Sequence, residues 1–213
     1  MNKLLITVAA AAAFTTAAHA TDLPSKASAP AAAQASAASV NTLTAGYGYE
    51  FDAGDYDAST ATTYSVSFDH SLGGGFSIGA AAGTSQAAGE GALKQTIEAT
   101  GSFKQPLIAG FTGKVGGSVG ERFTDGADYA FYTLNAGLDY KVSDSLTLNA
   151  LGYRYRNTFD TAAYSWESHQ ISTGATFNIM KDHAVFVKLA RSYDADFSAA
   201  TTDAVTVGYK LSF

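Results

Sequence analysis

Beyond residue 41, large apolar side chains recur at every second position, and this period restricts the chain to β-structure. The clearest set is Tyr132, Leu134, Ala136, Leu138 and Tyr140. The intervening positions carry Gly, Ser, Thr, Asn or a charged residue. Because successive side chains of a strand point to opposite faces of a sheet, this alternation predicts strands that are apolar on one face only.

The alternation divides the chain into ten predicted strands. They cover residues 42–51, 61–71, 75–84, 92–104, 110–123, 129–141, 146–156, 164–179, 184–193 and 203–213. These lengths suit tilted strands that cross a bilayer with about 9–11 residues each, plus extensions. An unpaired strand edge in hydrocarbon costs several kcal/mol per polar group, so such a sheet has to close. We therefore predict an all-β fold, a closed antiparallel transmembrane β-barrel of ten strands, with eight strands as the alternative.

Two further features favour a barrel over a soluble β-sandwich, in which the residues would also alternate. The connections alternate between short ones and longer polar ones; the short ones are 71–74, 105–109, 142–145 and 180–183. Aromatic residues gather at the predicted strand ends, as they do at the two interfaces of a bilayer. A sandwich would place its large aromatic residues in mid-strand, in the core between two sheets.

The N-terminal region reads as an export signal followed by a linker. Residues 1–20 combine Lys3, a short apolar run and the small-x-small ending Ala18-His19-Ala20, which is typical of a secretory signal peptide. Residues 21–41 are rich in Ala, Ser and Pro and predict a disordered periplasmic leader. The predicted barrel then occupies residues 42–213.

Composition excludes several classes of function. The chain has no Cys, which excludes disulfides, thiol nucleophiles and Cys-ligated metals. Its 13 Lys+Arg against 19 Asp+Glu leave a net charge of −6, which argues against a nucleic-acid partner. No residue spacing indicates a metal site or a cofactor, and the acids between the strands are expected to form a solvated surface.

The last nine residues carry the most specific motif. Apolar residues occupy every second position up to a terminal phenylalanine: Val205, Val207, Tyr209, Leu211 and Phe213. This segment resembles the terminal signal of Gram-negative outer-membrane barrels, which implies recognition by the barrel-assembly machinery. The chain as a whole resembles the small porin-like, opacity-type surface antigens. That resemblance implies an outer-membrane location, with membrane lipid and lipopolysaccharide as partners.

The predicted register places charges inside the barrel. If the phenylalanines that flank the turn at 105–109 both face outward, Glu98 faces Lys114. The same requirement across 124–128 puts Lys114 beside Asp139. We therefore predict an interior charge layer of Glu98, Lys114 and Asp139, in which opposite charges support one another across strands. A structural salt-bridge plug is favoured over an ion-selecting ring, because small barrels fill their lumen with side chains.

Strand 146–156 has an inconsistent period. Its apolar residues change parity along the strand: Leu146 and Leu148, then Tyr153 and Tyr155. A β-bulge near Gly152 would let both pairs face lipid. Arg154 and Arg156 would then point inward and could line a pore mouth. The alternative is a pair of rim arginines that meet lipid phosphates or loop carboxylates.

Small residues dominate other predicted inward positions: Ser77, Gly79, Ala81, Gly83, Gly116, Ser118 and Gly120. Ten strands also enclose more area than eight, so side chains need not fill the interior. We therefore expect a narrow lumen that contains water.

The residues disfavour catalysis, and the chain is not expected to be an enzyme. His169 and Ser172 are three positions apart, so a strand would point them to opposite faces. The leading expectation is a porin-like surface protein with a structural role and passive diffusion of small solutes. An adhesin-like surface protein is the alternative, and a lipid- or peptide-hydrolysing enzyme is the least favoured.

Overall fold

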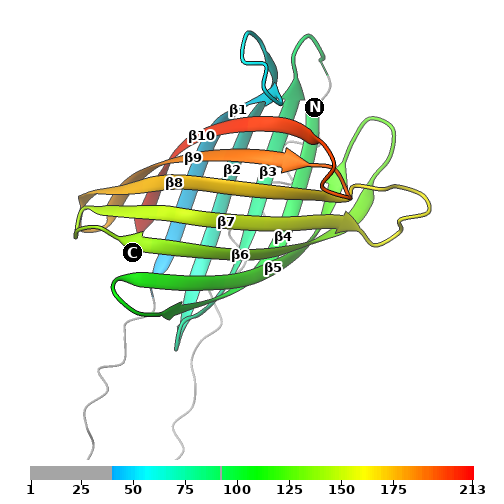
Figure 1. Ribbon diagram of the computed structural model, residues 1–213. Helices are drawn as coiled ribbons and strands as arrows, with labels where there is room; N and C mark the ends of the chain where they lie inside the picture. The colour runs from blue at the N-terminus through cyan, green and yellow to red at the C-terminus, as the bar shows by residue number, and fades with distance from the viewer. Residues whose placement is uncertain (1–39, 92) are drawn as a thin grey trace, which may run out of the picture.

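The computed structural model describes residues 40–91 and 93–213, which form one closed barrel (Figure 1). The predicted signal peptide, and all but the last two residues of the predicted leader, lie outside the described residues. The strands are β1 (Asn41–Asp52), β2 (Ser59–Gly73), β3 (Phe76–Ala87), β4 (Leu93–Pro106), β5 (Phe111–Phe123), β6 (Tyr129–Lys141), β7 (Leu146–Thr158), β8 (Ser168–Met180), β9 (His183–Tyr193) and β10 (Ala200–Ser212). The predicted all-β, ten-stranded antiparallel barrel is therefore confirmed, and the eight-stranded alternative is wrong.

The barrel closes where the first strand meets the last. β1 pairs antiparallel with β10 from Thr42↔Ser212 to Asp52↔Thr202. Backbone hydrogen bonds of 2.8 and 2.9 Å between Asn41 and Phe213 extend this seam. Every other strand pairs with its neighbours in the chain, so no strand is left with an open edge. No helix in the described part of the chain is long and apolar enough to cross a membrane.

The two ends of the barrel carry connections of different length, as predicted. At one end, here called the turn end, the strands are joined by residues 74–75, 107–110, 142–145 and 181–182. The opposite end, here called the loop end, carries residues 53–58, 88–92, 124–128, 159–167 and 194–199. Figure 1 shows the loop-end connections standing out beyond the strands.

The outer wall exposes the apolar face of the strands. Val115 and Leu134 are each 56% exposed and Val207 is 50% exposed. Among the described residues, the largest fully buried side chains are Phe131 and Thr158, both near the loop end. A soluble protein of this size would bury its large aliphatic residues in a core, so this wall is built for an apolar surrounding.

The bulge predicted near Gly152 is present in β7. Leu138 of β6 pairs with Leu151, but the next residue, Asp139, pairs with Asn149, so Ala150 is the extra residue. The pairing of β7 with β8 shifts over the same stretch. The bulge lets both apolar halves of β7 face outward, and it turns Arg154 and Arg156 toward the lumen.

The predicted registers around β5 are wrong. Glu98 faces Gly120, not Lys114, and Lys114 faces Lys104 on that side. The reason is the turn: Ala109 and Gly110 take the left-handed φ values of 51° and 83°, so β4 runs on through Pro106. On the other side, Lys114 faces Gly137 and Asp139 faces Thr112, a shift of two residues. The first shift is six residues and the second is two. Both are even, so every side chain keeps its predicted face.

The predicted strand 164–179 begins only at Ser168. Aromatic alternation continues through Tyr164 and Trp166, but these rings pack on Tyr129 and Phe131 of β6. Contacts within the loop therefore replace strand pairing in this segment.

Candidate functional site in the barrel lumen

Three cavities follow one another along the inside of the barrel. The first, toward the loop end, has a volume of about 620 Å³, the second about 590 Å³ and the third, toward the turn end, about 580 Å³. The first and second share the side chains of Ala81, Glu98, Arg154, Gln170 and Lys188, here called the upper layer. The second and third share Asp69, Ser102, Lys104 and Lys210, here called the lower layer. The cavities thus form one series that spans the barrel.

Cations outnumber acids on the inner wall, although the chain as a whole is acidic. Eight strand residues that line the cavities are cationic: Lys94, Lys104, Lys114, Arg122, Arg154, Arg156, Lys188 and Lys210. Four are acidic: Glu50, Asp69, Glu98 and Asp139. The loop-end connections show the opposite sign, because they contain nine Asp or Glu and no Lys or Arg. The barrel therefore has a basic interior behind an acidic rim.

The structure brings together two of the three residues of the predicted charge layer. Lys114 Nζ lies 2.7 Å from Asp139 Oδ2. Asp139 also accepts a 2.8 Å hydrogen bond from Asn149. Glu98 has other partners: it accepts a 2.6 Å hydrogen bond from Ser118, and its ion partner is Arg156, at 3.7 Å. All three predicted residues line the second cavity.

An aromatic cluster fixes two arginines at the loop end of the first cavity. Trp166, from the loop 159–167, packs edge-on against the buried ring of Phe131. The guanidinium carbons of Arg122 and Arg156 lie 4.1 and 4.3 Å from the centre of the Trp166 ring. Cation–π contacts of this kind stabilise both guanidinium groups, and Arg156 has its ion pair with Glu98 in addition. A Cβ on Gly120 would collide with the carbonyl oxygen of Ile97 and lie 3.0 Å from the Phe131 ring, so β5 requires a glycine beside this cluster.

The loop that carries Trp166 is itself tied down. Thr158, at the end of β7, donates a hydrogen bond from its hydroxyl to the carbonyl of Tyr164. Asp160 accepts a 3.1 Å hydrogen bond from the backbone N–H of Ala163. The tryptophan therefore belongs to a folded loop above the lumen.

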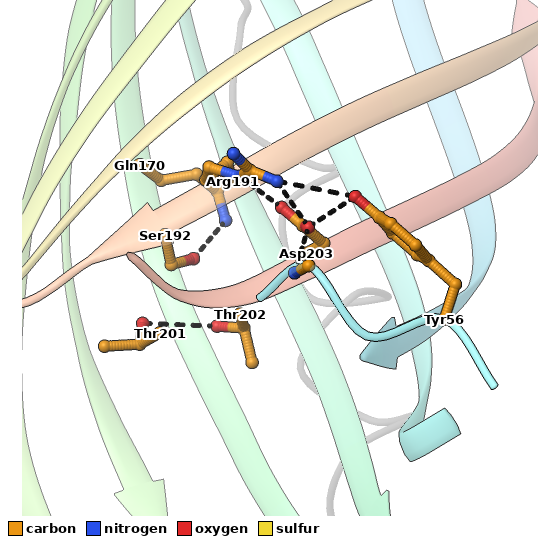
Figure 2. A network of polar contacts seen from close by, with 8 residues as sticks. Tyr56, Gln170, Arg191, Ser192, Thr201, Thr202 and Asp203 are labelled. Atoms are coloured by element: carbon orange, nitrogen blue, oxygen red, sulfur yellow. Dashed lines mark hydrogen bonds and ion pairs between the residues drawn. The ribbon is translucent and has the colours of Figure 1, made fainter. Parts of the chain in front are cut away.

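A second polar network lies on the outer wall, at the loop end (Figure 2). Arg191 of β9 donates two hydrogen bonds of 2.7 Å to Asp203 of β10. The same carboxylate accepts a 2.6 Å hydrogen bond from the Tyr56 hydroxyl and a 3.1 Å bond from the Gly54 N–H. The bond to the Asp203 carboxylate raises the pKa of Tyr56 above its usual value. This network anchors the loop 53–58 to the wall.

The loop 194–199 is stabilised by hydrogen bonds to the carboxylate of Asp194, its first residue. Asp194 accepts hydrogen bonds from the Ala199 N–H, at 3.1 Å, and from the Ser198 hydroxyl, at 2.9 Å. These bonds, that of Ala199 foremost, hold the pKa of Asp194 below its usual range. This carboxylate is therefore used within its own loop.

The residues of the terminal motif lie along β10 and just after it. Val205, Val207 and Tyr209 pair with Leu189, Val187 and Val185 of β9. Their side chains are exposed on the outer wall; Leu211 is partly exposed, and Phe213 is 63% exposed. The motif thus forms an apolar stripe beside the β1–β10 seam.

The histidine and serine weighed as a catalytic pair are apart. Ser172 lines the second cavity, whereas His169 contacts Tyr153 and the carbonyl of Ala195, at 2.7 and 3.0 Å. In residues 40–91 and 93–213, no three His, Asp or Glu side chains are close enough to hold a metal ion.

Parity alone is enough to place further lumen cations that were not among the predicted site residues. Lys188 and Lys210 each stand between two outward apolar residues, so both had to point inward. The cluster around Trp166 and the network of Arg191, Asp203 and Tyr56 had no such signal, because each joins a loop to distant strands.

Solved structures similar to this barrel include proteins of the bacterial outer membrane. The COG4313 outer membrane channel from Pseudomonas putida F1 has a TM-score of 0.51 at 9% identity, over 82% of this chain and 95% of that one. The fold is that of the outer-membrane β-barrels.

Two further barrels are similar at lower TM-scores. The KdgM porin in complex with disordered oligogalacturonate has a TM-score of 0.45 at 15% identity, over 80% of this chain and 99% of the porin. Ail, the attachment invasion locus protein of Yersinia pestis, has a TM-score of 0.38 at 11% identity, over 82% and 99%. No family model matches this chain, and no curated protein matches it.

Proposed function

We propose that this chain is an integral outer-membrane barrel, porin-like, through which small hydrophilic solutes diffuse passively. The observation that carries the proposal is the series of three lumen cavities that share their lining residues from one end to the other. Polar and charged side chains line this series, while apolar side chains cover the outer wall. A wall of this kind separates lipid from water.

Recording from planar bilayers tests the proposal. The mature chain, folded in detergent and added to a lipid bilayer, is expected to produce discrete current steps in potassium chloride. The same preparation unfolded by heat should be silent. Folded protein that inserts into the bilayer and gives no steps would overturn the diffusion function.

Insertion and partners belong to the same proposal. The apolar stripe of β10 would be read by the barrel-assembly machinery, and the outer wall would contact membrane lipid and lipopolysaccharide. In cells, Phe213→Ser is expected to lower the amount of barrel in the outer membrane, because it removes the last outward apolar residue of the stripe. Unchanged assembly of this variant would contradict recognition through that residue.

Surface interaction is a second candidate, supported by aromatic residues exposed on the loops. Tyr56 is 59% exposed, Phe159 62% and Phe197 43%, all at the loop end. Exposed aromatic side chains are enriched where proteins bind partners. Cell-binding assays with the loop 159–167 replaced by a short Gly/Ser turn would test this role, and binding equal to that of the unaltered barrel would exclude this loop.

A further inference from the structure

The first cavity holds more cationic groups than its acids can neutralise. Its strand residues include five cations: Lys94, Arg122, Arg154, Arg156 and Lys188. Its acids are Glu50, Glu98, Glu167 and Asp194. Glu98 is bound by Ser118 and Arg156, and Glu167 accepts a hydrogen bond from the Tyr155 hydroxyl. Asp194 is bonded within its own loop.

Of the three arginines that line this cavity, only Arg156 has an acidic partner among the described residues. Within the described part of the chain, neither Arg122 nor Arg154 forms an ion pair with a carboxylate. The Nε atom of each is buried and has no hydrogen-bond partner there. Buried polar atoms in folded proteins are almost always hydrogen-bonded, and leaving a charged one unsatisfied is costly. Two such donors beside one cavity point to an acceptor that binds between them.

Arg122, and the side chains that line the cavity beside Arg154, are held in place before any ligand arrives. Arg122 stacks on Trp166, whose other contacts include Arg156 and the buried Phe131. Arg154 stands in the upper layer with Lys188, whose Nζ lies 3.4 Å from Gln170 Oε1. Gln170 is in turn bonded to Ser192 at 3.2 Å. Donors fixed in this way lose little conformational entropy when a ligand binds.

We infer that the first cavity is a binding site for small solutes that carry a carboxylate or phosphate group. The planar fork of an arginine matches the paired oxygens of such groups, and a pair of arginines can grip one group from two sides. A volume of about 620 Å³ admits a small organic anion. The inference rests on the proposed function, because it names the class of solute that the diffusion pathway takes up.

The single tryptophan of the chain gives a direct readout, because it lies in this cavity. Fluorescence of Trp166 is followed in the folded, detergent-solubilised chain during titration with inorganic phosphate and, separately, with citrate, against chloride at equal ionic strength. The unaltered chain is expected to show a saturable change with phosphate or citrate and none with chloride. Arg154→Gln should weaken the binding about tenfold or more, since a charged hydrogen bond is lost.

The variants separate the site from its surroundings. Arg154 does not stack on the tryptophan, so its substitution leaves the fluorophore's own contacts in place. Lys141→Gln removes the same charge from an exposed position at the turn end of β6 and should leave the binding unchanged. If Arg154→Gln does not fold, Lys188→Gln replaces it, with the same expectation.

Two results would overturn the inference: no saturable change in the unaltered chain, or equal binding by the unaltered chain and the lumen variant. Neither depends on conduction. A barrel that binds phosphate or citrate but is silent in bilayers contradicts the diffusion function and supports the binding site. A barrel that conducts without saturable binding supports the diffusion function and contradicts the binding site.

Discussion

Arg191 and Asp203 face each other across β9 and β10 on the outside of the barrel, joined by two hydrogen bonds of 2.7 Å. Tyr56, far away in the sequence, adds its hydroxyl to the same carboxylate at 2.6 Å. The pair therefore does more than link two neighbouring strands: it holds the loop 53–58 against the wall. This arrangement ties the position of that loop to the ionisation of Tyr56.

The first prediction is that the loop 53–58 detaches at high pH. The pKa of Tyr56 is raised above 10.0, so the folded chain binds this proton more tightly than the unfolded chain does. The stabilisation is fully present below pH 10.0 and is lost as pH rises through the raised pKa. A spin label on Ala58→Cys should gain mobility over that range. In Tyr56→Phe the label should be mobile throughout, and a pH transition in that variant would contradict the account.

The second prediction concerns the ion pair inside the lumen. The side chains of Lys114 and Asp139 are 30% and 19% exposed, so Lys114→Gln leaves a half-buried carboxylate with Asn149 as its remaining partner. The free energy of unfolding in lipid vesicles should fall by about 1–3 kcal/mol. Lys141→Gln, which breaks an exposed pair with Asp144, is the control and should change nothing measurable. Equal effects of the two substitutions would contradict a structural role for the inner pair.

The third prediction is that a large side chain at Ala81 narrows the pathway. Ala81 belongs to the upper layer, where the first two cavities meet. Ala81→Phe should lower the single-channel conductance several-fold, because the added ring lies in the lumen. Ala80→Phe adds the same ring to the outer face of the same strand and should leave the conductance unchanged. A normal current through Ala81→Phe would mean that ions do not pass this layer.

The fourth prediction uses the bulge in β7. Deleting Ala150 removes the extra residue and leaves the pairs Leu138↔Leu151 and Asp139↔Asn149 in register, so the barrel should still fold. Deleting Val119 from β5, whose two ladders run without a shift, turns Arg122 toward the outer wall and should prevent folding. Heat-modifiable migration on SDS gels distinguishes the two outcomes. Loss of folding in the Ala150 deletion would show that the bulge is required.

Much of the fold could be predicted because a barrel wall has a simple period. Alternation fixed the face of each residue, and the conflict between Leu148 and Tyr153 was enough to locate the bulge. Register was harder, since it depends on where a turn closes: Ala109 and Gly110 place the β4–β5 turn at 107–110, later than the predicted 105–109. An even error along a strand keeps the face and loses the partner: the prediction for Glu98 is six residues from its true partner, Gly120, and that for Lys114 is two residues from Gly137.

The candidate site was predicted only in part for a related reason. Arg154 and Arg156 could be turned inward by parity, but the stacking of Arg156 on Trp166 depends on how the loop 159–167 folds back. No period describes such a loop. Its shape follows from single contacts, such as the hydrogen bond from Thr158 to Tyr164.

The most direct test of the account is the accessibility of adjacent positions on one strand in lipid vesicles. The chain has no cysteine, so Leu134→Cys and Asn135→Cys can each carry one nitroxide label. Leu134 lies on the outer wall and Asn135 lines the second cavity. Oxygen dissolved in lipid should increase the spin relaxation rate of the label at 134. A water-soluble nickel complex should increase that of the label at 135. A label at 135 shielded from the nickel complex, or one at 134 reached by it, would contradict a wet interior inside a lipid-facing wall.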